Sequence, residues 1–272
     1  MPEFLTLHDA IARHLRDGMS VALEGFTHLI PFAAGNEIIR QGRRDLTLIR
    51  MTPDLVCDRL IGAGCANRLV FSWGGNPGVG SLHRFRDAVE HQWPRPLEIE
   101  EHTHAGMVNR YIAGASGMPF AVLRAYRGTD LLARAKHVAP LTCPFSGEEL
   151  VAVAALQPDV TIIHAQQADR HGNVRLWGIV GIQKEAVLSA RTAIVTVEEI
   201  VNEFDAPRYV GEVIIPAMAV TAIALTPNGA WPSYADGYYE RDNDAYREWN
   251  TTSKDRASFE QWVKDVAMVV HA

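Results

Sequence analysis

Apolar residues near the start of the chain recur with the period of a helix and are followed by a short continuous apolar run. Three-four spacing fills residues 7–15, and Thr6 can cap this segment with Asp9 in a capping-box position. The pattern therefore predicts a helix that Gly18 terminates. The run at residues 20–23 is typical of a buried strand.

This helix–strand order recurs along the chain. Strands that alternate with helices of about ten residues predict right-handed crossovers and a parallel sheet. We therefore expect an α/β fold, with an open, largely parallel sheet, helices on both faces, and one domain across residues 1–272. The further helices are expected at 34–41, 54–61, 81–90, 242–249 and 258–270, and the further strands at 46–49, 68–72, 97–100, 160–164, 193–197, 213–215 and 220–225.

Composition narrows the classes of protein to consider. The 272 residues are 47% hydrophobic and 21% charged, which excludes a disordered chain and allows a full core. Because the net charge is −6, binding to nucleic acid is disfavoured.

The compartment can also be predicted. Three cysteines, an odd number, without a secretory signal favour reduced thiols in the cytoplasm. The longest apolar stretch, residues 213–225, is interrupted by Pro216 and is too short to cross a bilayer. We expect a cytoplasmic protein with no membrane partner.

The ends of the predicted strands are the places to search for a site, because open α/β sheets bind ligands beyond the carboxyl ends of their strands. Glu24 follows an apolar strand, where a carboxylate is costly unless it is paired or functional. Gly25 allows a ligand to approach the backbone closely.

A glycine-rich turn that includes Gly74 and Gly75 follows the strand at 68–72. Backbone N–H groups in such a turn can hold an anion, although a merely flexible loop explains the glycines equally well. The turn matches neither the Walker A motif nor G-x-G-x-x-G, so a nicotinamide cofactor is disfavoured. A serine-hydrolase elbow is also missing from the sequence.

Acidic and histidine side chains gather at residues 100–104. His102 and His104 would share one face of a strand. The H-E-x-x-H zinc signature is missing, so we favour a polar pocket wall over a metal site. Glu101 beside a histidine is a candidate acid–base group, and a solvated strand end is the alternative.

Several segments carry a resemblance to a known family. Residues 17–26 resemble the first signature of family I CoA-transferases, and Ala168–Val174 resembles their Ala-Asp-x-x-Gly-Asn segment. The Glu-containing strand end of the family is similar to residues 195–201, and 117–120 with 128–129 fit the intervening stretch. Residues 24–32, 72–78 and 238–243 are similar to the branch related to glutaconate CoA-transferase.

Two departures from the family pattern lie in and after the first signature. Glu24 stands where the family has the first glycine of Gly-Gly-Phe, and the glycine that the family has shortly before the following proline is missing. The second signature, Ser-Glu-Asn-Gly, is missing from the 272 residues. In the family that motif carries the nucleophilic glutamate on a B subunit. The resemblance therefore implies half of an enzyme, completed by a B subunit in an α2β2 heterotetramer.

The resemblance implies transfer of CoA from succinyl-CoA to a dicarboxylic or keto acid, with 3-oxoadipate favoured. The reaction would pass through glutamyl anhydride and glutamyl-CoA intermediates, with a CoA thioester as substrate and no permanently bound cofactor. The backbone of Gly25 and Phe26 is the expected oxyanion site, and Glu101 is the weaker acid–base candidate. The expected substrate-binding residues are Glu24, Thr27, Ser72, Gly74, Gly75, Asn76 and His102.

Three alternatives stay open. The chain could belong to a glutaconate-type CoA-transferase, which acts on a different acid. It could be part of an acyl-CoA or ring-opening hydrolase, in which water replaces the acceptor acid. It could also be an assembly subunit without chemistry of its own.

Overall fold

A computed structural model describes the whole chain except residues 77, 206, 208–209 and 269–272. The first half alternates strands and helices as expected. Thr6 caps the first helix, since its side-chain oxygen accepts a hydrogen bond from Asp9 N–H at 3.1 Å. The elements are β1 (Glu3–Phe4), α1 (Leu7–His14), β2 (Ser20–Glu24), α2 (Phe32–Arg40), β3 (Leu46–Ile49), α3 (Leu55–Gly62), β4 (Ala66–Phe71), α4 (His83–His91) and β5 (Glu98–Glu101).

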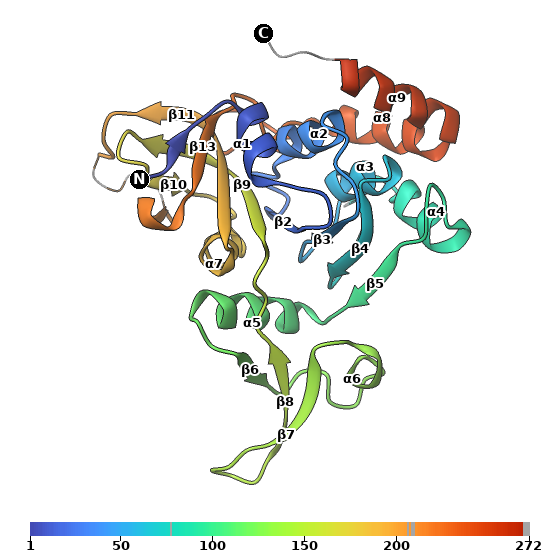
Figure 1. The fold of residues 1–272 in the computed structure, drawn as a ribbon, viewed down its shortest axis with the longest axis vertical. Coiled ribbons are helices and arrows are strands. Elements are labelled where there is room, and N and C mark those ends of the chain that lie inside the picture. Colours follow the sequence, from blue (N-terminus) through green and yellow to red (C-terminus); the bar gives the residue numbers. More distant parts are fainter. Residues whose placement is uncertain (77, 206, 208–209, 269–272) are drawn as a thin grey trace.

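The middle of the chain forms a small antiparallel sheet that the sequence pattern did not predict. Its strands lie in the order β6-β8-β7, and it projects from the large sheet below α5 (Figure 1). Val151 and Val153 face inward and form a core of their own with Ala113 and Tyr126. The elements of this region are α5 (His104–Ala115), β6 (Phe120–Leu123), α6 (Leu131–Arg134), β7 (Val138–Thr142) and β8 (Glu149–Ala154).

The second half returns to the large sheet and ends in two helices. The helix expected at 258–270 is described as far as Met268, and its predicted positions 269–270 lie outside the described residues. The elements are β9 (Val160–Asp169), β10 (Val174–Leu176), α7 (Gln183–Ser189), β11 (Thr192–Val201), β12 (Val213–Ile215), the 3-10 helix η1 (Ala217–Ala219), β13 (Ala222–Leu225), α8 (Asn243–Lys254) and α9 (Arg256–Met268).

The large sheet confirms the predicted fold class. Its main strands run parallel in the order β1-β13-β11-β9-β2-β3-β4-β5, and only β10 and β12 join antiparallel among the residues described. Because β2 and β9 are neighbours, the two halves of the chain meet at the centre of this sheet. The expectation of one domain across 1–272 stays a prediction.

Alternate side chains of the central strands build two cores. Val21 and Leu23 face the layer of α1, α2 and α3, whereas Ala22 faces the layer of α5 and α7. Helices therefore cover both faces of the sheet (Figure 1). Continuous apolar runs such as 20–23 are explained by this two-sided burial.

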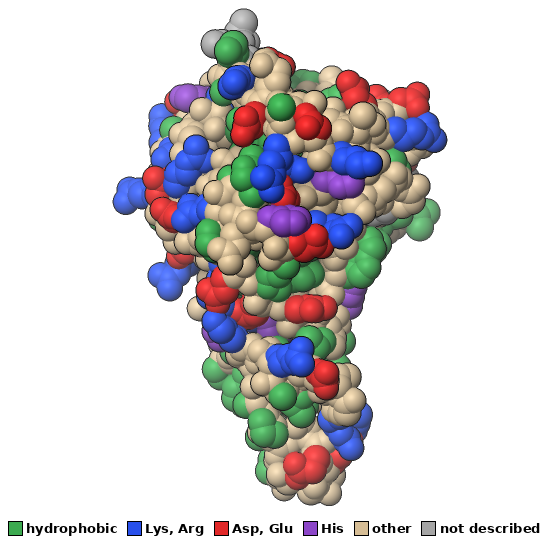
Figure 2. All heavy atoms as spheres, turned by 90° about the vertical axis from the view of Figure 1, so that its right-hand side faces the viewer, with side chains coloured by type: hydrophobic (Ala, Val, Ile, Leu, Met, Phe, Trp, Pro, Cys, Tyr) green, Lys and Arg blue, Asp and Glu red, His purple; other side chains and the backbone are tan. Residues whose placement is uncertain are grey.

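The face of the molecule drawn in Figure 2 carries no single dominant charge. On the face in Figure 2, acidic and basic side chains are interspersed over both the broad upper part and the narrow lower part. None of the described helices has the length and apolar character needed to cross a membrane.

Candidate functional site

A pocket of about 290 Å³ lies at the carboxyl ends of β2 and β4, where a loop from the C-terminal region joins them. We call it the strand-end pocket. Phe26 and Thr27 are the predicted site residues that line it, while the other predicted residues are not among its lining. Its walls are formed by Phe26, Thr27, Ile30, Thr52, Asp54, Trp73, His104, Arg241 and Tyr246.

The turn after β2 has a backbone that only certain residues tolerate. A Cβ on Gly25 would lie 2.5 Å from the carbonyl oxygen of Leu29, so a side chain here would displace backbone. Thr27 and Leu29 have φ of 59° and 51°, a left-handed conformation that is unfavourable for a β-branched residue. Strained backbone of this kind is concentrated at functional sites.

Arg50 stabilises this turn by hydrogen bonds to its backbone carbonyl groups. Its fully buried guanidinium donates to Gly25 O at 2.7 Å and also to Leu23 O. It forms an ion pair with Asp54 at 2.7 Å, and Asp54 caps α3 by accepting from Val56 N–H at 3.1 Å. The buried charge is therefore paired, and the conformation of the turn is coupled to the start of α3.

Glu24 points into the protein rather than into the strand-end pocket. Its carboxylate accepts hydrogen bonds from Met51 N–H at 2.9 Å and from the Tyr111 hydroxyl at 2.8 Å. Burial raises the pKa of Glu24, although the charge of Arg50 opposes the rise. Structural pairing, one of the two explanations offered by the sequence, accounts for these contacts.

His28 is a residue of this turn that the sequence pattern did not single out. Its Nε2 accepts from Asp236 N–H at 2.9 Å, and its Nδ1 lies 3.2 Å from the carbonyl oxygen of Ile179. A carbonyl only accepts, so Nδ1 carries the hydrogen and the ring is neutral. Burial lowers the pKa of His28. In the sequence, only its position in the turn, four residues after Glu24, could have pointed to His28 as a residue of the site.

The glycine-rich turn after β4 contributes Trp73 to the pocket. A Cβ on Gly75 would lie 2.6 Å from the tip of the Trp73 indole, so a side chain there would displace this partly exposed ring. The Ser72 hydroxyl donates to Met51 O at 2.6 Å, so its hydrogen is already engaged. Asn76 is buried, and its side-chain amide has no hydrogen-bond partner among the described residues. The expected substrate contacts of Ser72, Gly74, Gly75 and Asn76 stay predictions.

The acidic cluster after β5 differs from the expected arrangement. His104 begins α5 behind the Thr103 cap, so it does not share a strand face with His102. Glu100, not Glu101, is the carboxylate that contacts His102, with Glu100 Oε1 and His102 Nε2 2.8 Å apart. Glu101 is exposed at the end of β5. Its acid–base role stays a prediction.

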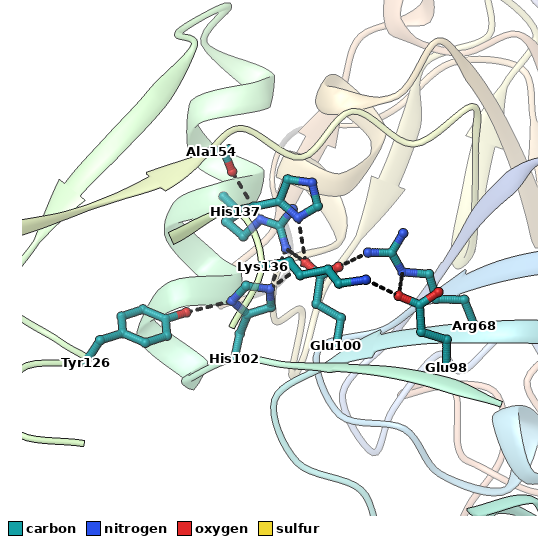
Figure 3. Close-up of polar contacts among 9 residues, drawn as sticks. Arg68, Glu98, Glu100, His102, Tyr126, Lys136, His137 and Ala154 are labelled. Carbon is teal, nitrogen blue, oxygen red and sulfur yellow. Dashed lines mark hydrogen bonds and ion pairs between the residues drawn. The ribbon is translucent and has the colours of Figure 1, made fainter. Parts of the chain in front are cut away.

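Glu100 is the centre of a buried network that links β5 to α5 and to the small sheet (Figure 3). Arg110 donates to Glu100 Oε1 at 2.8 Å, and His137 Nδ1 lies 3.0 Å from the same oxygen. Burial alone would raise the pKa of Glu100. Hydrogen bonding to His102 and the charges of Arg110 and His137 outweigh burial and hold the pKa well below its usual range.

A second buried carboxylate, Glu198, lies on β11. Its oxygens accept from the Tyr239 hydroxyl at 2.6 Å and from Asn228 N–H at 2.7 Å, and His164 Nε2 lies 2.6 Å away. The pKa of Glu198 is lowered because these hydrogen bonds outweigh burial. Through these hydrogen bonds, Glu198 on β11 connects the loop after β13 to the large sheet. Within the described ranges, no group of three or more potential ligand residues is arranged to hold a metal ion.

Comparison with known proteins places this geometry in context. Residues 4–225 match the model of the family described as coenzyme A transferase. The chain is 60% identical over 265 residues to the A subunit of the 3-oxoadipate CoA-transferase of Pseudomonas knackmussii. The match covers 97% of this chain and 93% of that protein.

More distant relatives share the fold. The chain is 34% identical over 283 residues to the A subunit of the glutaconate CoA-transferase of Acidaminococcus fermentans, covering 97% of this chain and 88% of that protein. The crystal structure of the glutaconate coenzyme A-transferase from that organism superposes with a TM-score of 0.89 and 32% identity. That superposition covers 98% of this chain and 89% of the crystallised chain.

Proposed function

Because this chain belongs to the coenzyme A transferase family, we propose that it is the A subunit of a heteromeric enzyme that transfers CoA from succinyl-CoA to 3-oxoadipate. The observation that carries the proposal is the 60% identity to the A subunit of a 3-oxoadipate CoA-transferase, which extends over 97% of the chain. The strand-end pocket supports it, because small-molecule sites are apolar clefts with a few polar groups.

A B subunit completes the active site in this proposal. The sequence lacks the Ser-Glu-Asn-Gly signature, so the nucleophilic glutamate would come from the partner chain in an α2β2 assembly. Phe26 and Trp73 are 37% and 48% exposed at the pocket. Large exposed aromatic side chains are typical of surfaces that a partner covers.

The proposed reaction is covalent catalysis with ping-pong kinetics. The partner's glutamate oxygen attacks the thioester carbonyl carbon, the C–S bond breaks, and CoA thiolate leaves behind an acyl-glutamyl anhydride. The thiolate then attacks the glutamyl carbonyl, which releases succinate and forms glutamyl-CoA. The carboxylate of 3-oxoadipate repeats these steps in reverse, yielding 3-oxoadipyl-CoA and the free glutamate.

This chain would supply the surroundings of that reaction. Each tetrahedral intermediate develops an oxyanion, and one preorganised donor is worth about 3–4 kcal/mol. We assign the backbone N–H groups of Gly25 and Phe26 to this role, since Arg50 fixes the turn that carries them. Thr27 lies in the same pocket and would contact substrate. The apolar walls would exclude water from the anhydride, which water would otherwise hydrolyse.

The proposal needs no permanently bound cofactor, because the CoA thioester enters as substrate. The expected cytoplasmic location also stays a prediction.

The test uses the chain co-expressed with its B subunit. The complex is incubated with succinyl-CoA, with and without 3-oxoadipate, and every CoA species is identified by mass. We expect 3-oxoadipyl-CoA only when the acceptor is present, and none when this chain or its partner is incubated by itself.

Other results would favour the alternatives. Free CoA released without acceptor would indicate a hydrolase. Transfer to glutaconate but not to 3-oxoadipate would indicate a glutaconate-type transferase. A B subunit that is equally active without this chain would leave it an assembly role only.

A further inference from the structure

The strand-end pocket combines apolar walls with one guanidinium. Phe26, Ile30 and Trp73 provide hydrophobic surface, and Arg241 comes from the loop that precedes α8. The turn that carries the proposed oxyanion site and Arg241 therefore border the same cavity. An acyl chain lying in the pocket would contact both.

Arg241 is held in place by the core. Its guanidinium carbon lies 4.0 Å from the centre of the Tyr246 ring, within the range of a cation–π contact. Tyr246 is only 2% exposed and packs edge-on against Phe32, with ring centres 6.4 Å apart. The platform beneath the guanidinium is consequently rigid, which reduces the entropy lost when Arg241 binds an anion.

Asp54 is the carboxylate in the lining of the pocket, and its negative charge is paired within the protein. Asp54 pairs with Arg50 and accepts the Val56 N–H, so its negative charge is balanced within the protein. Arg241 brings a permanent positive charge to the same lining. The pocket is thus suited to an apolar chain that ends in an anion.

We propose that Arg241 determines specificity for dicarboxylic substrates by binding the carboxylate distant from the reacting group. The planar guanidinium matches a carboxylate with two parallel hydrogen bonds. This inference rests on the proposed function, in that the bound chain is the acyl substrate. Ser72 is an expected substrate-binding residue, but its hydroxyl already donates to Met51 O, so we assign the distal carboxylate to Arg241.

The test compares two six-carbon acids that differ at one end, adipate and hexanoate. Binding to the complex of this chain with its B subunit is measured by calorimetry, and initial rates of CoA transfer to each acid are measured in parallel. The variants are Arg241→Gln, Arg241→Lys and the control Arg247→Gln. Arg247 lies on α8, is 67% exposed and pairs with Asp244 at 2.6 Å.

We expect Arg241→Gln to weaken adipate binding about 10- to 100-fold, the effect of losing hydrogen bonds to a charged group, and to leave hexanoate within about twofold. Arg241→Lys keeps the charge but loses the fork, so it should recover part of the preference for adipate. Arg247→Gln should behave as the unsubstituted protein.

Equal losses for both acids, or unchanged adipate binding, would overturn the inference. So would an unsubstituted complex that does not prefer adipate. If Arg241→Gln does not fold, the comparison of Arg241→Lys with the unsubstituted complex decides: an unaltered ratio of adipate to hexanoate binding contradicts the proposal. If 3-oxoadipyl-CoA never forms but adipate binding still depends on Arg241, the proposed acceptor is wrong and the role of Arg241 stands.

Discussion

At the scale of single residues, the turn after β2 depends on one buried arginine and one glycine. Arg50 donates to Leu23 O, Gly25 O and Thr52 O, and it pairs with Asp54. These contacts hold carbonyl groups at the point where the strand ends. Gly25 is needed because the backbone carbonyl of Leu29, four residues later in the chain, lies where a Cβ would be.

We predict that Gly25→Ala lowers the free energy of unfolding by about 1–3 kcal/mol, the usual cost of overpacking. The added Cβ would lie 2.5 Å from Leu29 O, and backbone cannot yield as a side chain can. Urea unfolding measures the loss. Gly74→Ala is the matched control, since its Cβ would have no neighbour closer than 3.8 Å. Equal losses in the two variants would contradict the explanation.

A second prediction concerns the pH dependence at Glu24. Burial raises its pKa above the ordinary value of 4.5, so the folded protein binds this proton more tightly than the unfolded chain. The stabilising contribution is complete below about pH 4.5 and is lost as the pH rises through the folded pKa. Glu24→Gln mimics the protonated carboxyl, so its stability relative to the unsubstituted protein should increase from about pH 4.5 to about pH 8.

Urea unfolding at both pH values checks this prediction. The variant Glu101→Gln, at an exposed position, is measured in parallel as the reference for removing a carboxyl group. If the stability of Glu24→Gln relative to the unsubstituted protein fell with rising pH, the carboxylate would be more stabilised by its hydrogen bonds than destabilised by burial.

At the scale of elements, the Glu100 network determines how the small sheet is attached. Arg110 on α5 also donates to the carbonyl oxygen of Ala154 at 3.1 Å, so it joins β5 to β8. His137, which precedes β7, contacts the same carboxylate. The small sheet is therefore joined to the large one through ion pairs as well as through the chain itself.

We predict that Glu100→Gln lowers the free energy of unfolding by about 3–5 kcal/mol at about pH 7, because it leaves the buried Arg110 without its counter-charge. The pKa of Glu100 is lowered, so its contribution is present above about pH 4.5 and is lost as the pH falls through the folded pKa. The penalty should therefore shrink at pH values below about 4.5.

Unfolding at about pH 7 and about pH 4 measures this difference. Glu98→Gln removes an exposed partner of Lys136 and is the control, with a much smaller expected loss. A penalty for Glu100→Gln that is independent of pH would show that packing, not charge, explains it.

At the scale of the whole molecule, the segment after β13 completes the site. The family model matches residues 4–225, yet Arg241 and Tyr246, which line the pocket, lie beyond that range. Asp236 binds His28, and Tyr239 binds Glu198. The C-terminal helices then pack on the layer of α2, α3 and α4, which anchors the loop between them and the sheet.

The anchor is a buried hydrogen bond, from Trp249 Nε1 to Asp58 Oδ2 at 3.0 Å. Burial raises the pKa of Asp58 to about 6, although Phe85 N–H and Trp249 oppose the rise. We predict that Trp249→Phe lowers the free energy of unfolding by about 1–3 kcal/mol at about pH 7, since an ionised buried carboxylate loses a donor.

The pH dependence distinguishes this loss from lost packing. Because the pKa of Asp58 is raised, the stabilising contribution of its proton is complete below about pH 3.8 and is lost as the pH rises through about 6. The Trp249→Phe penalty should therefore be smaller at about pH 5 than at about pH 8 in urea unfolding. Trp262→Phe, in the same aromatic cluster, is the control and should show a loss that does not change with pH.

The sequence by itself determined the α/β fold, because period and run length are local properties that burial imposes on each strand and helix. It also led to the turn at Gly25–Thr27, since strand ends are visible in the pattern. It did not predict the small sheet, in which β6 and β7 bury few residues.

Only the tertiary structure decided which side chains share the pocket. Glu24 and His102 occupy strand ends, but both are buried. The Tyr111 hydroxyl on α5 donates a hydrogen bond to Glu24, and the Tyr126 hydroxyl lies within hydrogen-bond distance of His102. Arg241 lies more than 200 residues from Phe26 and reaches the pocket because the chain folds back over the sheet. Contacts between such distant positions depend on packing, and no local pattern records them.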